Sequence, residues 1–95
     1  MAGKNLIVIM SDGHDPRYLG SAGSDLAHTP ALYRLAASGV RFSNAYTPCP
    51  ICVPARAAFA TGRPVYQTAC WDNAQAYDGS IPGWAQYLRD AGRSV

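Results

Sequence analysis

The sequence contains no glutamate and only one lysine, so aspartate and arginine carry almost all of its charge. The six acidic residues are scattered along the chain, and the formal net charge at pH 7 is only +2. Neither a basic patch nor an acidic tail is present to attract an oppositely charged polymer or surface. The charge balance therefore argues against a nucleic-acid partner and against a membrane partner.

Long hydrophobic runs and a paired set of cysteines are also missing. The apolar run after Lys4 is about six residues long, too short to span a bilayer, and no small-residue cleavage site of an export signal follows it. The three cysteines are an odd number, so a closed disulfide framework would leave one thiol over. A reducing compartment is the simplest explanation, and we predict a cytoplasmic location.

Two stretches have the composition of strands. Residues 5–11 (NLIVIMS) are continuously apolar, which is typical of a strand buried on both faces of a parallel sheet, and residues 40–46 predict a second, shorter strand. Such a sheet needs parallel neighbours and helices on both sides. The fold class is therefore predicted as α/β. Residues 1–95 are expected to be an incomplete N-terminal portion of a larger catalytic domain. The remainder of the full-length chain would then be a partner that this portion needs to complete the domain.

Three segments are predicted helices because each opens near a proline and closes at a glycine. The first begins at Thr29-Pro30 and stops at Gly39, and the others cover residues 54–61 and 82–91. Residues 63–80 are predicted to form a long irregular loop.

Residues 49–56 (CPICVPAR) place a cysteine and an arginine at the start of the second predicted helix. Unpaired backbone N–H groups and the helix dipole at the position of Cys52 favour an anion, and Arg56 lies one helical turn further on. Asp12 follows the first predicted strand, at the sheet edge where open α/β folds bind ligands, and its carboxylate suits a hard cation. The three residues together indicate a site for an oxyanion ester.

The motif Cys52-Val53-Pro54-Ala55-Arg56 matches the C-x-P-x-R signature of the type I sulfatases, of the alkaline-phosphatase-like superfamily. It continues to a T-G-R sequence at residues 61–63, as the family's extended signature does. Ser11-Asp12 after the first strand, the Thr29-Pro30 helix and residues 39–46 (GVRFSNAY) also look like the family's N-terminal pattern, in the same order. Nearly the whole chain therefore resembles the N-terminal segment of a sulfatase.

This resemblance implies a fold with a largely parallel sheet flanked by helices, and hydrolysis of a small-molecule sulfate monoester. Cys52 would be converted to formylglycine by the formylglycine-generating enzyme, which reads Pro54 and Arg56, and the hydrated aldehyde would attack sulfur. Arg56 would steady that nucleophile. Asp12 and residue 52 would bind a divalent metal ion, Ca²⁺ first, with Mg²⁺ or Mn²⁺ as alternatives.

The sequence departs from many sulfatases at one position. Gly13 follows Asp12 where many members have a second aspartate, and in this respect, as in residues 71–74 (WDNA), the chain resembles the choline-sulfatase-like and phosphonate-monoester-hydrolase-like branch. A phosphonate monoester or a phosphodiester therefore remains an alternative substrate. The candidates for the substrate pocket are His14, Arg63 and Trp71.

Two further interpretations stay open. The family's catalytic lysine and histidines normally come from sequence beyond residue 95, so the chain alone is expected to be an inactive fragment. The pair Cys49 and Cys52 also forms a C-x-x-C motif, which would suit a thiol redox protein or half of a zinc site.

Overall fold

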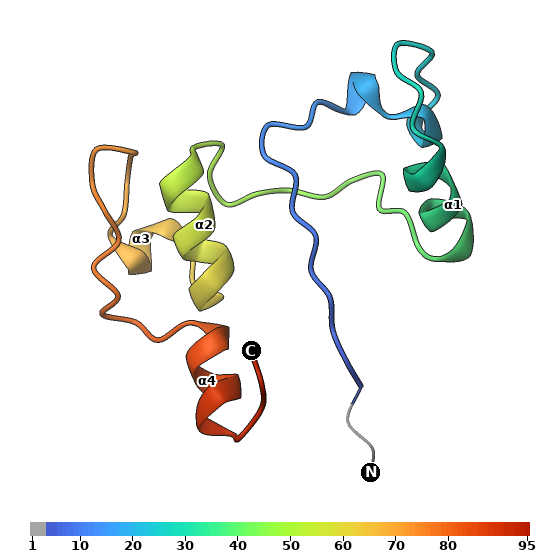
Figure 1. The fold of residues 1–95 in the computed structure, drawn as a ribbon. Helices are drawn as coiled ribbons and strands as arrows, with labels where there is room; N and C mark the ends of the chain where they lie inside the picture. The colour runs from blue at the N-terminus through green and yellow to red at the C-terminus, as the bar shows by residue number, and fades with distance from the viewer. Residues whose placement is uncertain (1–3) are drawn as a thin grey trace. The chain divides into compact units, whose positions relative to one another are not determined.

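The computed structural model describes residues 4–95, and within that range the chain forms helices and loops without a strand (Figure 1). It divides into two compact units, Met1–Ser43 and Asn44–Val95, here called the N-terminal unit and the C-terminal unit. The N-terminal unit contains the short 3₁₀ helices η1 and η2 and the helix α1 (Pro16–Tyr18, Gly20–Ala22 and Pro30–Ser38). The C-terminal unit contains the helices α2, α3 and α4 (Cys52–Thr61, Val65–Thr68 and Trp84–Asp90).

The two predicted strands, residues 5–11 and 40–46, are wrong for this structure. Both stretches lack strand hydrogen bonding, and Leu6, Ile7 and Ile9 are 81%, 83% and 88% exposed. A strand exists only when another strand accepts and donates its backbone hydrogen bonds, and residues 4–95 offer none of that pairing. The α/β class is therefore not visible in the described part of the chain.

In the N-terminal unit, side chains of loop residues hold the short helices in place. Asp15 Oδ1 accepts the Arg17 backbone N–H at 2.9 Å, and Arg17 Nη2 lies 2.6 Å from Asp15 Oδ2. Thr29 occupies the N-cap position of α1 as predicted, but its hydroxyl accepts the N–H of Gly20 at 2.9 Å and does not cap α1 itself. The hydroxyl of Thr29 therefore connects η2 to the start of α1, and α1 ends before Gly39 as predicted.

In the C-terminal unit, α2 begins at Cys52, two residues before the predicted start at residue 54. The difference follows from the chemistry of proline. Pro54 lacks an N–H, but the N–H groups of a first helical turn have no partner within the helix, so proline is tolerated at this point. Cys52 is therefore the first residue of the helix rather than a residue outside it. Gly62 ends α2 with a φ of 66°, and its N–H donates to the Ala58 carbonyl at 2.9 Å.

The predicted loop at residues 63–80 contains the short helix α3, which the sequence did not indicate. The last helix, α4, begins at Trp84, two residues later than predicted. Gly83 precedes it, and its N–H donates to Gln86 Oε1 at 2.9 Å. A Cβ on Gly83 would lie 2.9 Å from the Ala60 carbonyl oxygen, so only glycine lets the start of α4 approach the last turn of α2 so closely.

The core of the C-terminal unit is small and is built around α2. α3 and α4 both contact α2 (Figure 1). The buried side chains are Pro54, Ala57, Ala58, Thr68 and Cys70. At the edge of this core the rings of Phe59 and Trp84 meet edge to face, with centroids 6.2 Å apart and an interplanar angle of 86°. Among residues 4–95, no helix has the length and apolar content needed to cross a bilayer.

Candidate active site

Cys52 is an exposed thiol at the first position of α2. Ile51 is the N-cap residue and provides no side-chain hydrogen bond to the helix. The positive end of the helix dipole therefore lies at residue 52, an environment that favours an anion. The position suits a group that carries or receives negative charge.

The other two residues of the motif have different surroundings. Pro54 is almost completely buried in the core of the C-terminal unit, whereas Arg56, one turn after Cys52, is exposed. Buried Pro54 thus anchors the first turn of α2, and Cys52 and Arg56 both remain accessible to solvent. A guanidinium at this position can bind an oxyanion held near residue 52.

Asn73, a loop residue, contacts the first turn of α2, and we did not identify it from the sequence as a site residue. Its Oδ1 accepts the backbone N–H of Val53 at 2.9 Å. Asparagine side chains often accept hydrogen bonds from the first N–H groups of a helix, so the residue type alone could have suggested this role for Asn73. Its partner lies 20 positions earlier in the chain, however, and nothing in the local sequence indicates that pairing.

A hydrogen-bonded loop presents Asn73 to the helix. Asp72 Oδ1 accepts the N–H groups of Ala74 at 2.8 Å and Gln75 at 3.1 Å. The buried Cys70 thiol lies 3.3 Å from the Gln75 carbonyl oxygen and donates to it. Trp71, a candidate for the substrate pocket, lies in the same loop and is 56% exposed.

Asp12 lies in a turn of the N-terminal unit and is exposed, as is His14. Gly13, between them, has a φ of 62°, in the left-handed region that favours glycine. Since Asp12 and Cys52 belong to different units, the predicted sharing of one metal ion stays a prediction. Within residues 4–95 no group of three or more His, Cys, Asp or Glu side chains could hold a metal ion. Ca²⁺ takes about six to eight oxygen ligands, so the Asp12 carboxylate alone would supply only part of the ligand set that such an ion needs.

Arg63 lies at the opposite end of α2 from Cys52. It follows the C-cap residue Gly62, and its N–H donates to Thr61 Oγ1 at 3.2 Å. α2 has ten residues, so its two ends are separated by roughly 15 Å at the usual helical rise. The placement of Arg63 in a substrate pocket beside Cys52 therefore stays a prediction.

All three cysteines lie in the described part of the chain, and all are free thiols. Cys49 is partly buried, Cys52 is exposed and Cys70 is buried. The C-x-x-C pair is thus not joined by a disulfide here, and the two thiols differ in accessibility.

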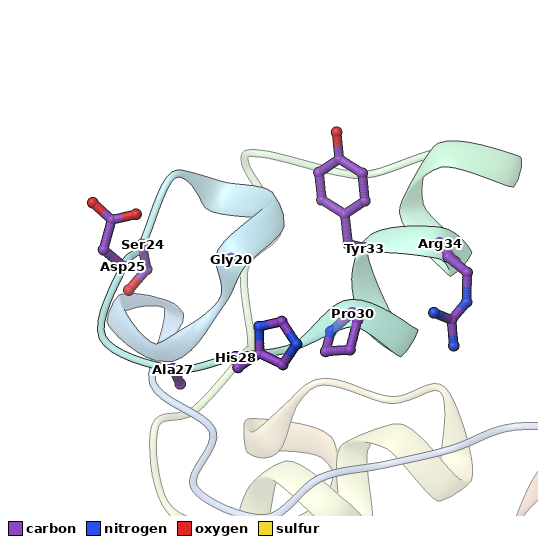
Figure 2. Close-up of a pocket in the computed structure, with 8 residues that line it drawn as sticks. All are labelled: Gly20, Ser24, Asp25, Ala27, His28, Pro30, Tyr33 and Arg34. Atoms are coloured by element: carbon purple, nitrogen blue, oxygen red, sulfur yellow. The ribbon is translucent and has the colours of Figure 1, made fainter.

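A hollow in the N-terminal unit contains none of the predicted site residues. It is lined by η2, α1 and the chain between them, and its polar side chains include Asp25, Tyr33 and Arg34 (Figure 2). Figure 2 shows these three side chains pointing in different directions rather than toward one point. Since a binding site needs convergent polar groups, this hollow is a weaker candidate than the start of α2.

Comparison with known proteins identifies the relatives of this chain. A protein-family model described as Sulfatase matches residues 4–92. The choline-sulfatase of Rhizobium meliloti (strain 1021) is 41% identical over 88 residues, which are 93% of this chain and 17% of that protein. Arylsulfatase K of Danio rerio is 34% identical over 88 residues, again 93% of this chain and 17% of the relative.

An uncharacterized sulfatase of Escherichia coli (strain K12), YidJ, is 35% identical over 88 residues, which are 93% of this chain and 18% of that protein. The chain thus spans less than a fifth of the length of these relatives. No solved structure is a significant match. Since the family match includes nearly every residue and the C-x-P-x-R motif at the start of α2, the chain belongs to the sulfatase family.

Proposed function

We propose that this chain is the N-terminal portion of a sulfuric ester hydrolase in which residue 52, after conversion of its thiol to formylglycine, is the nucleophile. The observation that supports this most directly is the placement of Cys52. It is exposed, it is the first residue of α2, and it shares that helix with Pro54 and Arg56 of the family signature. The N-terminus of α2 favours the negative charge of a sulfate group.

Each residue of the motif has a proposed role. The formylglycine-generating enzyme would recognise Pro54 and Arg56 around Cys52. In the folded protein Arg56 would hold the sulfate oxygens or the hydrated aldehyde by charge-assisted hydrogen bonds. When present, formylglycine supplies a hydroxyl nucleophile through its hydrated aldehyde.

The proposed site for a divalent ion has only some of its ligands within residues 1–95. Asp12 would contribute one carboxylate ligand and residue 52 another ligand, with Ca²⁺ as the first choice of ion. The bound ion would polarise the sulfate oxygens. Since the chain spans so little of its relatives, the remaining ligands would come from sequence outside residues 1–95, as would the strands that pair with residues 5–11 in an α/β sheet.

The substrate class is proposed as a small sulfate monoester. The single carboxylate at Asp12-Gly13 also favours, as a second candidate, a phosphonate monoester or a phosphodiester. His14, Arg63 and Trp71 stay predictions for the substrate pocket, and the cytoplasmic location stays a prediction as well.

Two cysteine variants test the proposal in a full-length protein that carries this segment. Cys52→Ala should abolish hydrolysis of para-nitrophenyl sulfate, because it removes the atom from which the nucleophile is made. Cys49→Ala is the matched control, since it removes a thiol three residues away, and its activity should equal that of the parent. Phosphonate and phosphodiester analogues of the same ester, measured in parallel, rank the substrate classes.

Two results would contradict the proposal. Activity that survives Cys52→Ala would remove residue 52 from the chemistry. Activity that depends equally on Cys49 and Cys52 and is lost with a thiol-blocking reagent would instead favour the redox interpretation of the C-x-x-C motif.

A further inference from the structure

We infer that Asn73 is a positioning residue for the nucleophile, holding the first turn of α2 so that residue 52 faces the ester in one direction. The inference rests on the proposed function, because it concerns the same site. It begins with a gap in α2 itself. The N-cap residue is the apolar Ile51, which gives no side-chain cap, and Pro54 has no N–H. A first turn of this kind depends on an acceptor from elsewhere.

Asn73 provides that acceptor. The donor is the N–H of Val53, so the atom that faces it, 2.9 Å away, is the side-chain carbonyl oxygen. The amide NH₂ of Asn73 therefore lies on the other side of the group. The contact joins two segments of the C-terminal unit that are 20 residues apart in sequence, so it is a tertiary contact and not part of a local turn.

The hydrogen bond acts directly on residue 52 through the peptide group. The Val53 N–H belongs to the planar peptide unit between residues 52 and 53, so holding that N–H holds the whole plane. This plane is attached to the Cα of residue 52. With the plane fixed, the side chain of residue 52 keeps mainly the rotation about its Cα–Cβ bond. The direction of the nucleophile is then set by few degrees of freedom.

The loop around Asn73 is itself restrained, which makes the contact effective. Asp72 Oδ1 closes a turn by accepting two backbone N–H groups, those of Ala74 and Gln75. The Cys70 thiol, buried in the core, donates to the Gln75 carbonyl. Asn73 lies between these two anchors, so its position relative to α2 is tied to the packing of the C-terminal unit.

The experiment compares three variants in the full-length, formylglycine-containing protein with para-nitrophenyl sulfate as the probe. In Asn73→Ala the acceptor is lost, and kcat should fall by about 10-fold to 100-fold, as expected for a misplaced reacting group, with little change in KM. In Asn73→Asp the carboxylate accepts the same N–H beside a helix N-terminus, and most of kcat should return. Asn44→Ala removes an exposed asparagine elsewhere in the C-terminal unit and should behave as the parent.

Hydrogen exchange of the Val53 amide provides a readout independent of turnover. This amide should exchange faster in Asn73→Ala and return to the parent rate in Asn73→Asp, while the amides of α4 stay unchanged. Should Asn73→Ala fail to fold, Asn73→Asp and Asp72→Ala still decide the question. Asp72→Ala loosens the turn that presents Asn73 and should lower kcat in the same way by a smaller factor.

Three results separate the explanations. An unchanged kcat in Asn73→Ala would overturn the inference. An Asn73→Asp variant that protects the Val53 amide but is as inactive as the alanine variant would also overturn it, because Asn73 would then act through its NH₂ group on the substrate. A parent protein without activity, or activity that survives Cys52→Ala, would instead refute the proposed function itself.

Discussion

The two units of this chain differ in how far they can bury their own apolar residues. In the C-terminal unit, α2 is covered by α3, α4 and the loop after α3, and small side chains such as Ala57, Ala58 and Cys70 form a core. In the described part of the N-terminal unit, residues 4–43, no residue is buried, and the most apolar stretch of the sequence is exposed.

This difference indicates which part of the site is organised locally. The start of α2 is held by buried Pro54 below it and by Asn73 beside it, both within the C-terminal unit. The turn that carries Asp12 follows residues 5–11, whose apolar side chains have no cover in this unit. The start of α2, where we propose the nucleophile, is therefore held by contacts within the C-terminal unit. The proposed cation position depends on a sheet that residues 4–95 do not form.

Amide hydrogen exchange on the 95-residue chain should show this contrast as its largest effect. We expect amides in the middle of α2 to exchange at least about tenfold more slowly than those of residues 5–11, because hydrogen-bonded and buried backbone opens less often. In a full-length protein residues 5–11 should become protected as well, since the proposed sheet would then pair them. Equal protection of the two segments in the 95-residue chain would contradict the comparison.

The substitution Gly83→Ala should destabilise the C-terminal unit selectively. The added Cβ would lie 2.9 Å from the Ala60 carbonyl oxygen, a backbone atom that cannot move aside on its own. We expect a loss of about 1–3 kcal/mol in the free energy of unfolding, typical of overpacking, measured by denaturant titration. Amide exchange in α1 should stay unchanged.

Gly39→Ala is the matched control in the N-terminal unit. Its Cβ would lie 3.5 Å from the Leu35 carbonyl oxygen, an ordinary contact, and the φ of −141° is open to any residue. A change of no more than about 0.5 kcal/mol is expected. If Gly83→Ala increased exchange in α1 as much as in α2, the two units would unfold together, against this account.

The pH dependence of the Asp15–Arg17 pair should be the smallest effect and should be confined to the N-terminal unit. The hydrogen bonds from the Arg17 side chain and then from its backbone N–H lower the pKa of Asp15. The same side-chain pairing raises the pKa of Arg17. Because the pKa of Asp15 is lower in the folded chain, its stabilisation of η1 is present at neutral pH and disappears as the pH falls through that lowered value.

An NMR titration of the Asp15 carboxyl group tests this pair. In Arg17→Ala the pKa of Asp15 should rise toward the ordinary aspartate value, and chemical shifts in α2 should not change. An unaltered pKa in that variant would remove Arg17 as the cause.

The sequence predicted those features that depend on residues nearby in the chain, such as the prolines and glycines at helix ends. Proline and glycine marked α1 correctly, and the C-x-P-x-R motif located the exposed cysteine at the start of a helix. The predicted start of α2 was two residues too late, because Pro54 was taken as the first residue of the helix. The N–H groups of a first helical turn have no acceptor within the helix, so a proline is tolerated at the third helical position as well.

The features that were missed depend on partners distant in sequence. Residues 5–11 have the composition of a strand, but pairing decides whether a strand forms, and that partner is not within residues 4–95. Asn73 is visible as a capping residue in the loop, but its hydrogen bond to Val53 is set by the packing of α2 against that loop. Composition alone cannot specify either contact.

The most direct test of the central claim is the mass of the tryptic peptide that covers residues 42–56, from protein purified from the organism in which the gene occurs. This peptide contains both Cys49 and Cys52. We expect a peptide about 18 Da lighter than the sequence predicts, with the change at residue 52 and an intact thiol at residue 49. A peptide with two unmodified thiols, or one about 2 Da lighter through a disulfide between them, would contradict the account.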